Sequence, residues 1–211
     1  HYAYIKVSEG CDNRCSYCTI PDIRGRFRSR PIESVVREAE ALVQAGVKEI
    51  ILIAQDTTRY GEDIYGTPVL ADLLKELTQI SNLHWIRWMY GYPTRITPEL
   101  IRVMAESPKI CSYIDLPLQH IDRTVLQQMN RPADPDQTRK LISDLRKNIP
   151  DLTLRTSFIV GYPGESEEAF NRLLAFLEEI RFDWVGAFTY SAEQGTKAAE
   201  LPKLIPEDIK I

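Results

Sequence analysis

The stretch Pro31-Ile-Glu-Ser-Val-Val-Arg-Glu-Ala-Glu-Ala-Leu-Val-Gln-Ala-Gly-Val-Lys-Glu-Ile-Ile-Leu-Ile-Ala54 places a helix directly before a strand. Apolar residues between Val35 and Val43 form one helical stripe, which Pro31 opens and Gly46 closes. Residues 48–54 have the length of a strand, and the last five of them, 50–54, are a continuous apolar run. Such runs are typical of parallel strands that are buried on both faces. The stretch therefore predicts a parallel sheet covered by helices.

The same order recurs along the chain. Strands are expected at residues 2–7, 48–54, 84–90, 113–116, 152–160 and 184–190. Helices are expected to begin near residues 31, 67, 97, 122, 134 and 166. Trp85 and Trp88 are expected in core and barrel packing. Six such units predict an α/β fold with an open parallel (β/α)6 sheet, a partial TIM-like barrel whose reactive groups lie at the carboxyl ends of the strands.

Three of the four cysteines follow the first expected strand. They lie in Gly10-Cys-Asp-Asn-Arg-Cys-Ser-Tyr-Cys18, so that Cys11, Cys15 and Cys18 have the spacing C-x3-C-x2-C. Iron–sulfur clusters are held by cysteine thiolates, and a cube with four irons has four ligand positions. Three thiolates on one short loop would leave one iron open for chemistry. The spacing therefore predicts a 4Fe–4S site.

Other uses of these thiols were weighed. A structural zinc site needs four closed ligands, and the fourth would have to be the distant Cys111 or one of three scattered histidines. A non-catalytic binding module stabilised by zinc or by a cluster is the alternative of another class. Disulfides belong to secreted chains, and no segment resembles a signal peptide. Cys111 is expected to be a small buried apolar residue.

Composition narrows the possible partners. The 211 residues are 44% hydrophobic and 27% charged, as in an ordinary globular domain, and the net charge of −4 gives no general basic field for nucleic acid. No apolar run has membrane-spanning length, so we expect a cytoplasmic protein without membrane or direct nucleic-acid contacts. Arginines at 24, 26, 28 and 30 form one local basic run, a substrate patch, a solvated loop or a dock for another domain. Both ends look cut, and we expect residues 1–211 to be one domain of a longer protein.

The cysteine loop carries a resemblance to a known family. The pattern C-x3-C-x-aromatic-C, with Tyr17 as the aromatic residue, resembles the radical S-adenosylmethionine superfamily. The resemblance implies a 4Fe–4S cluster on the three cysteines, whose open iron is chelated by the amino and carboxylate groups of S-adenosylmethionine. An electron from the reduced cluster then cleaves the sulfonium to a 5′-deoxyadenosyl radical, which abstracts hydrogen from the substrate. The protein supplies position and dryness for this cofactor chemistry.

Further motifs are similar to the methylthiotransferase branch, namely Cys18-Thr-Ile-Pro21, Arg24-Gly25, Ser29-Arg30 and Ile159-Val-Gly-Tyr-Pro-Gly-Glu165. Ala54-Gln-Asp-Thr-Thr-Arg-Tyr-Gly61 and Asp115-Leu-Pro-Leu-Gln-His120 resemble members that methylthiolate an aspartate side chain of a small-subunit ribosomal protein. Members that modify a tRNA adenosine are the alternative. The resemblance implies a ribosomal-protein substrate and an electron donor such as flavodoxin or ferredoxin. It also implies an N-terminal domain with a second 4Fe–4S cluster and a small C-terminal β domain, neither of which is found in residues 1–211.

The resemblance further implies a cofactor pocket at the strand ends. Tyr17 and Gln55 are expected beside S-adenosylmethionine, with Gln55 near its amino group, and Gln119 is expected at the ribose. Arg155 is expected at the carboxylate, because its forked donors suit that group, or else in an internal ion pair with Asp115. Gly161 either lets the adenosyl part approach the backbone or simply forms a turn. No residue is assigned a catalytic proton or hydrogen transfer.

Overall fold

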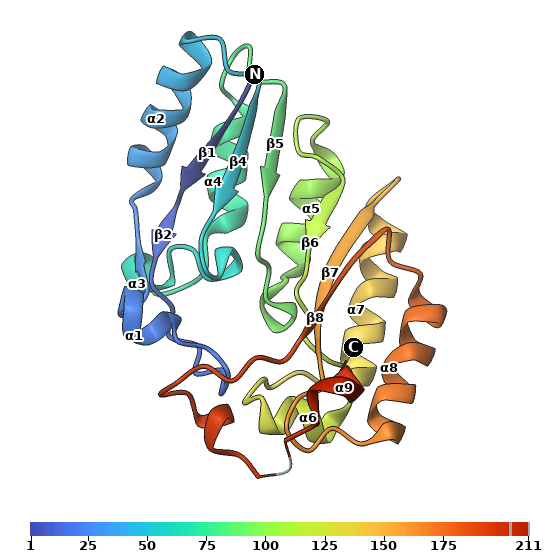
Figure 1. Cartoon of the computed structure of the whole chain (residues 1–211). Coiled ribbons are helices and arrows are strands. Elements are labelled where there is room, and N and C mark those ends of the chain that lie inside the picture. Colours follow the sequence, from blue (N-terminus) through green and yellow to red (C-terminus); the bar gives the residue numbers. More distant parts are fainter. Residues whose placement is uncertain (203, 211) are drawn as a thin grey trace.

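A computed structural model describes residues 1–202 and 204–210 of the chain. Six parallel strands form two three-stranded sheets (Figure 1). The first sheet has the order β1 (Tyr2–Lys6), β4 (Glu49–Ile53), β5 (Trp85–Trp88), and the second has the order β6 (Tyr113–Asp115), β7 (Thr153–Val160), β8 (Trp184–Thr189). All six predicted strands are therefore confirmed, and in the predicted order.

The two sheets meet where β5 passes the chain that leads into β6. The backbone N–H of Ile86 donates to the carbonyl of Lys109 over 2.7 Å, and the N–H of Cys111 donates back to the carbonyl of Ile86 over 2.9 Å. Strands β1 and β8 share no ladder in the described part of the chain, so the curved sheet remains open. The prediction of an open partial barrel is confirmed.

Five longer helices lie along the sheet in Figure 1. They are α2 (Ile32–Gln44), α4 (Leu70–Thr78), α5 (Pro98–Glu106), α7 (Pro135–Asn148) and α8 (Glu167–Ile180). The predicted starts are confirmed where the sequence offers a side-chain cap. Asp134 accepts hydrogen bonds from the first-turn N–H groups of α7, and Ser166 accepts one from Ala169 at the start of α8.

Shorter elements surround the carboxyl ends of the strands. They are α1 (Ile20–Arg24), α3 (Glu62–Tyr65), α6 (Arg123–Gln128), α9 (Glu207–Lys210), the antiparallel pair β2 (Ser8–Glu9) and β3 (Arg28–Ser29), and the 3₁₀ turns η1 (Thr57–Arg59), η2 (Pro93–Arg95) and η3 (Lys197–Glu200). The helix predicted from about Asp122 is α6, which this aspartate caps. The β2–β3 pair, α1 and α3 were not predicted, because each is too short to show a period.

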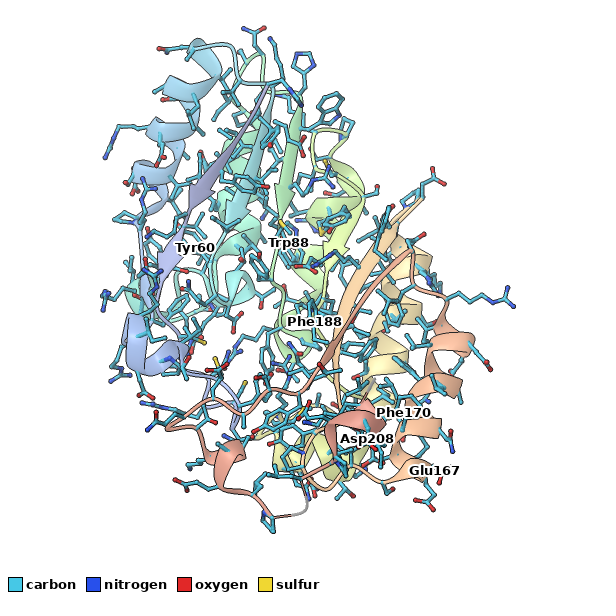
Figure 2. All side chains as sticks on the ribbon, in the orientation of Figure 1. Tyr60, Trp88, Glu167, Phe170, Phe188 and Asp208 are labelled. Atoms are coloured by element: carbon cyan, nitrogen blue, oxygen red, sulfur yellow. The ribbon has the colours of Figure 1, made fainter. Side chains whose placement is uncertain are left out.

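The core lies between the sheet and the helices. Alternate strand residues such as Ile50 and Leu52 of β4 are fully buried there, against leucines of α4 such as Leu74. Trp88 is also fully buried, as Figure 2 shows it within the fold, and its predicted core role is confirmed. Trp85 is 51% exposed, so the same prediction is wrong for it. Trp85 is the first residue of β5.

No helix within residues 1–202 and 204–210 combines the length and the apolar character needed to cross a membrane.

Candidate functional site

The three cysteines of the motif line one cavity at the carboxyl ends of the strands. These strand ends point toward the lower end of Figure 1. The cavity measures about 390 Å³, a size typical of ligand pockets. Its walls come from the cysteine loop, from the ends of β4, β5 and β6, and from one arginine after α6: Cys11, Asn13, Cys15, Tyr17, Cys18, Ile20, Ala54, Gln55, Asp56, Tyr90, Gly91, Tyr92, Pro117, Gln119 and Arg131. The fold therefore brings the thiols to the place that the sequence predicts.

The start of the cysteine loop requires glycine. Gly10 has φ +78°, and a Cβ there would lie 2.2 Å from the carbonyl oxygen of Arg26. The next residue, Cys11, donates its backbone N–H to the carbonyl of Gly25 over 3.2 Å. The backbone of the cysteine loop thus contacts the backbone of the segment after α1. Only glycine fits at position 10, because any side chain there would collide with that segment.

The middle of the cysteine loop is held by the end of α6, more than a hundred residues later in the chain. Ser16 donates its N–H to the carbonyl of Met129 over 3.0 Å and its hydroxyl to the carbonyl of Gln128 over 2.7 Å. The side-chain amide of Asn130 donates to the carbonyl of Arg14 over 2.7 Å. These bonds fix the loop through protein contacts alone, so it is preorganised for a ligand.

A buried carboxylate ties the cysteine loop to the ends of β4 and β5. Asp56 is 1% exposed and accepts hydrogen bonds from Asn13 (2.9 Å), Thr58 (2.8 Å) and Arg95 (2.7 Å). The guanidinium of Arg95 also donates to the side-chain oxygen of Asn13 over 3.2 Å. The buried charge of Asp56 is thereby paired and fully hydrogen-bonded, as a buried carboxylate must be.

The thiols of this loop do not have the lowered pKa that is typical of an isolated reactive cysteine. Burial raises the pKa of the Cys11 and Cys18 thiols, and the backbone N–H groups of Asn13 and Ile20 offset only part of that rise. Metal binding is what deprotonates such thiols. Among the described residues, no three cysteine, histidine or carboxylate side chains gather as ligands of one ion. Ligands to three different irons of a cube stand farther apart than the four ligands of one zinc ion.

A second cavity of about 230 Å³ adjoins the first. Tyr17 and Gln119 line both cavities, and Ser157 and Phe188 line the second. Gln119 has φ +71°, a left-handed conformation that costs free energy in a residue other than glycine. Burial also raises the pKa of the Tyr17 hydroxyl. The two cavities together offer room for a ligand larger than either would hold alone.

The carboxamide of Gln55 has an unused acceptor. Its Oε1 is buried and has no hydrogen-bond partner in the described structure, and the side chain lines the first cavity. A buried polar atom without a partner is unfavourable in the folded chain. The arrangement suits a donor group on a bound ligand.

Two predicted site residues are not among those that line either cavity. The guanidinium of Arg155 donates to the carboxylate of Asp115 over 2.6 Å, and Asp115 is fully buried, which confirms the ion pair named as an alternative. Gly161 has φ +70° and lies beside the side chain of Lys210, and Glu165 accepts its N–H, so the turn is present. A contact of either residue with a cofactor stays a prediction.

Sequence analysis missed Arg131, Tyr92 and Asn13. Each lies in the wall of the first cavity. Asn13 is one of the variable positions inside the cysteine motif, whereas Tyr92 and Arg131 are far from the cysteines in sequence. Arg131 follows the end of α6 and reaches the cysteine loop only because the chain folds back. An unpaired arginine in the wall of a thiol cavity is a signal that only the structure gives. The arginines of the basic run differ from Arg131 in being paired: Arg24, Arg26 and Arg30 each form an ion pair with a nearby carboxylate.

Comparison with protein families identifies the class. The model of the Radical SAM superfamily matches residues 5–177, which is most of the chain and includes the end of β1, the cysteine loop and the four parallel strands β4 to β7. The chain belongs to this superfamily.

Curated relatives carry a more particular name. The chain is 59% identical over 208 residues to "Ribosomal protein uS12 methylthiotransferase RimO" of Desulforamulus reducens, an alignment that covers 99% of this chain and 47% of the relative. It is 58% identical over 210 residues to the protein of the same name from Heliobacterium modesticaldum, covering 100% of this chain and 46% of the relative. The chain spans about half the length of the curated relatives it matches.

Solved structures support the fold. The radical S-adenosylmethionine methyltransferase TsrM from Kitasatospora setae, solved with cobalamin and a [4Fe-4S] cluster, superposes with a TM-score of 0.75 at 19% identity, over 94% of this chain and 38% of that one. Streptococcus suis SuiB bound to S-adenosylmethionine superposes with a TM-score of 0.64 at 19% identity, over 98% and 43%. At this identity the likeness concerns the fold alone.

Proposed function

We propose that this chain is the catalytic core of a methylthiotransferase that modifies an aspartate side chain of ribosomal protein uS12. The observation that carries the proposal is the three-cysteine loop in the wall of a ligand-sized cavity at the strand ends. The names of relatives at 50–59% identity over nearly the whole chain support the choice of substrate. Fold alone would not indicate a substrate, because one fold hosts many chemistries.

The residues present fit a 4Fe–4S cluster. Three thiols share one cavity, the loop that bears them is held by hydrogen bonds to α6, and two buried polar atoms beside it, Gln55 Oε1 and Arg131 Nε, lack partners in the described structure. We assign Cys11, Cys15 and Cys18 as the cluster ligands. When bound and reduced, such a cluster supplies the electron that cleaves S-adenosylmethionine.

We assign S-adenosylmethionine to the joined cavities. Gln55 would accept a hydrogen bond from its amino group, and Gln119 and Tyr17, which line both cavities, would lie along its ribose and adenine. Arg155 and Gly161 remain proposed contacts, at the carboxylate and at the adenosyl part. The apolar side chains of Ile159 and Phe188 in the second cavity would exclude water from the adenosyl group.

The whole protein is proposed to have two further parts. One is an N-terminal domain that holds a second 4Fe–4S cluster, and the other is a small C-terminal β domain for the macromolecular substrate. A reductant such as flavodoxin or ferredoxin would supply the electron. Each part is proposed from the resemblance, and the length of the relatives is consistent with them.

The first test concerns the cofactor. After anaerobic reconstitution we expect about four iron and four sulfide per chain. The reduced protein should then convert S-adenosylmethionine slowly to 5′-deoxyadenosine and methionine. One zinc per chain and no cleavage would instead support a non-catalytic metal-stabilised module.

The second test concerns the substrate. The full-length parent enzyme should add a methylthio group to an aspartate of uS12, read by mass spectrometry, while tRNA in the same mixture stays unmodified. The 211-residue chain should cleave S-adenosylmethionine without modifying uS12, because it holds one three-cysteine loop and its fourth cysteine lies apart. Modification of tRNA adenosine by the parent would favour the alternative substrate.

A further inference from the structure

Arg131 is a buried cation in the wall of the thiol cavity. It is 7% exposed and follows α6. Its Nη2 donates to the carbonyl of Pro117 over 2.7 Å, and its guanidinium lies 4.5 Å from the centre of the Tyr92 ring. Its Nη1 lies 3.7 Å from the sulfur of Cys15 and 3.4 Å from the hydroxyl of Tyr17. The positive charge is therefore aimed at the middle cysteine of the loop.

Among the described residues, no carboxylate forms an ion pair with Arg131. In the described part of the chain the neighbouring arginines are paired, Arg95 with Asp56 and Arg155 with Asp115, whereas Arg131 forms no ion pair. Its Nε is buried and has no hydrogen-bond partner there. A buried charge without a counter-charge is strongly unfavourable. The folded chain thus keeps a buried cation whose counter-ion the protein itself does not supply.

Among the described residues, Arg131 lies against one thiol and two phenols, those of Cys15, Tyr17 and Tyr92. A cysteine that ligates a metal does so as the thiolate, so a cluster on this loop would place negative charge at the Cys15 sulfur, next to Nη1 of Arg131. We propose that Arg131 is a positioning residue of the iron–sulfur cluster, donating to the Cys15 sulfur and raising the cluster's reduction potential through its buried positive charge. This inference rests on the proposed function.

The physical basis is general. Hydrogen bonds to the ligating sulfurs, the net charge of the site and its exposure to solvent set the potential of an iron–sulfur cluster. Reduction transfers one electron from an external reductant to the cluster and makes the site more negative by one charge. A fixed cation stabilises that reduced state more than the oxidised one, and the effect is larger where water is excluded. Tyr92 and Pro117 hold the guanidinium in place for this purpose.

A purely structural role is the competing explanation. The contacts of Arg131 with Pro117 and Tyr92 join the end of β6 to the end of β5, and this brace alone would account for its burial. The two roles differ in what they require. A brace needs the planar, forked guanidinium, whereas an effect on the potential needs the charge.

The test uses the reconstituted 211-residue chain with three substitutions. Arg131→Lys keeps the charge, Arg131→Gln keeps a hydrogen-bond donor without charge, and Arg131→Met keeps bulk alone. Arg14→Gln is the matched control, because it removes an equal charge next to Cys15 from a side chain that is 68% exposed. Iron per chain, thermal unfolding, and the potential from a redox titration followed by electron paramagnetic resonance are measured for each protein.

We expect a lower potential in the Gln and Met variants, a smaller shift in the Lys variant, and none in Arg14→Gln, with iron content preserved. Loss of the cluster in the Gln and Met variants but not in the Lys variant would also support the charge role. An unchanged potential at full iron in the Gln variant would overturn the proposal. So would loss of the cluster in all three variants while the chain stays folded, because geometry rather than charge would then be required. If Arg131→Met does not fold, the Lys and Gln variants decide.

Failure of the proposed function would look different. The unaltered chain would then take up no iron–sulfur cluster, and no redox titration would be possible for any variant. If the unaltered chain holds a normal cluster and the Arg131 variants have the same reduction potential as it has, the inference is wrong and the proposed function still stands.

Discussion

Two regions of the molecule differ in how they treat polar groups. One is the layer, the apolar core between sheet and helices. The other is the rim, the residues at the carboxyl ends of the strands that line the first cavity. In the layer, side chains such as Ile50, Leu52 and Leu74 are fully buried and wholly apolar. In the rim, Gln119 has a left-handed backbone, and within the described part of the chain Arg131 is buried without an ion-pair partner and Gln55 has a buried oxygen without a hydrogen bond. The layer stabilises the fold, and the rim lowers that stability. The difference shows that the rim is arranged for something that the isolated chain does not contain.

The sharpest way to break this comparison is Cys15→Ala. We expect complete loss of the reconstituted cluster's iron and absorbance, because three thiolates are the fewest that hold the cube on this loop. The unfolding free energy of the metal-free chain should change little, since Ser16 still ties the loop to α6. Cys111→Ala is the control and should keep the cluster. A cluster that survives in Cys15→Ala would contradict the ligand assignment.

The second substitution, Leu74→Ala, acts on the layer. Leu74 of α4 is fully buried, at 0% exposure, so its truncation leaves a cavity in the core. We expect the free energy of unfolding in urea to fall by about 2–5 kcal/mol, while the folded fraction keeps its iron. Leu174→Ala, at a 43% exposed position of α8, should change stability by about 0.5 kcal/mol or less. A large loss of iron in folded Leu74→Ala would show that layer and rim are coupled.

The third prediction concerns Asp122, which caps α6 and so supports the segment that holds the cysteine loop. Burial alone would raise its pKa, but hydrogen bonds from Val125 and the guanidinium of Arg172 lower it further than burial raises it. A lowered pKa stabilises the fold above the unfolded value of about 3.9 and ceases to do so as pH falls through the folded value.

Asp122→Asn keeps the capping oxygen and removes the charge. At pH 7 we expect it to lower the unfolding free energy by about 1 kcal/mol, because the charge-assisted hydrogen bond with Arg172 and the attraction of the carboxylate to the helix N-terminus are lost. The difference from the unaltered chain should shrink as pH is lowered below 4 and vanish once Asp122 is protonated in the folded state. Urea unfolding at a series of pH values measures this. A difference that does not depend on pH would show that the charge has no role.

The smallest expected effect is a gain. Gln55→Met removes the unpartnered Oε1 and keeps a similar shape, so we expect the metal-free chain to gain about 1 kcal/mol in unfolding free energy. The affinity of the reconstituted protein for S-adenosylmethionine, measured by equilibrium binding, should fall. Lower stability, or unchanged affinity, would mean that the unused acceptor is not kept for a ligand.

Local patterns were enough for the fold. The six strands and five long helices follow from apolar runs and stripes, together with capping residues such as Asp134 and Ser166. The short elements at the rim, β2, β3, α1 and α3, escaped prediction because two to five residues show no period. Trp85 was misplaced because the sequence of its own strand does not reveal which of its side chains the packed chain covers.

The sequence by itself determined the order of strands and helices, the three thiols after the first strand and the class of chemistry, since each depends on residues near one another in the chain. The tertiary structure decided which distant side chains meet those thiols. Arg131 reaches Cys15, and Asp56 joins Asn13 to Arg95, only after the strand ends converge. It also decided that Arg155 pairs with Asp115. Burial and counter-charge are properties of the packed chain, and they determine which polar groups stay free for a ligand.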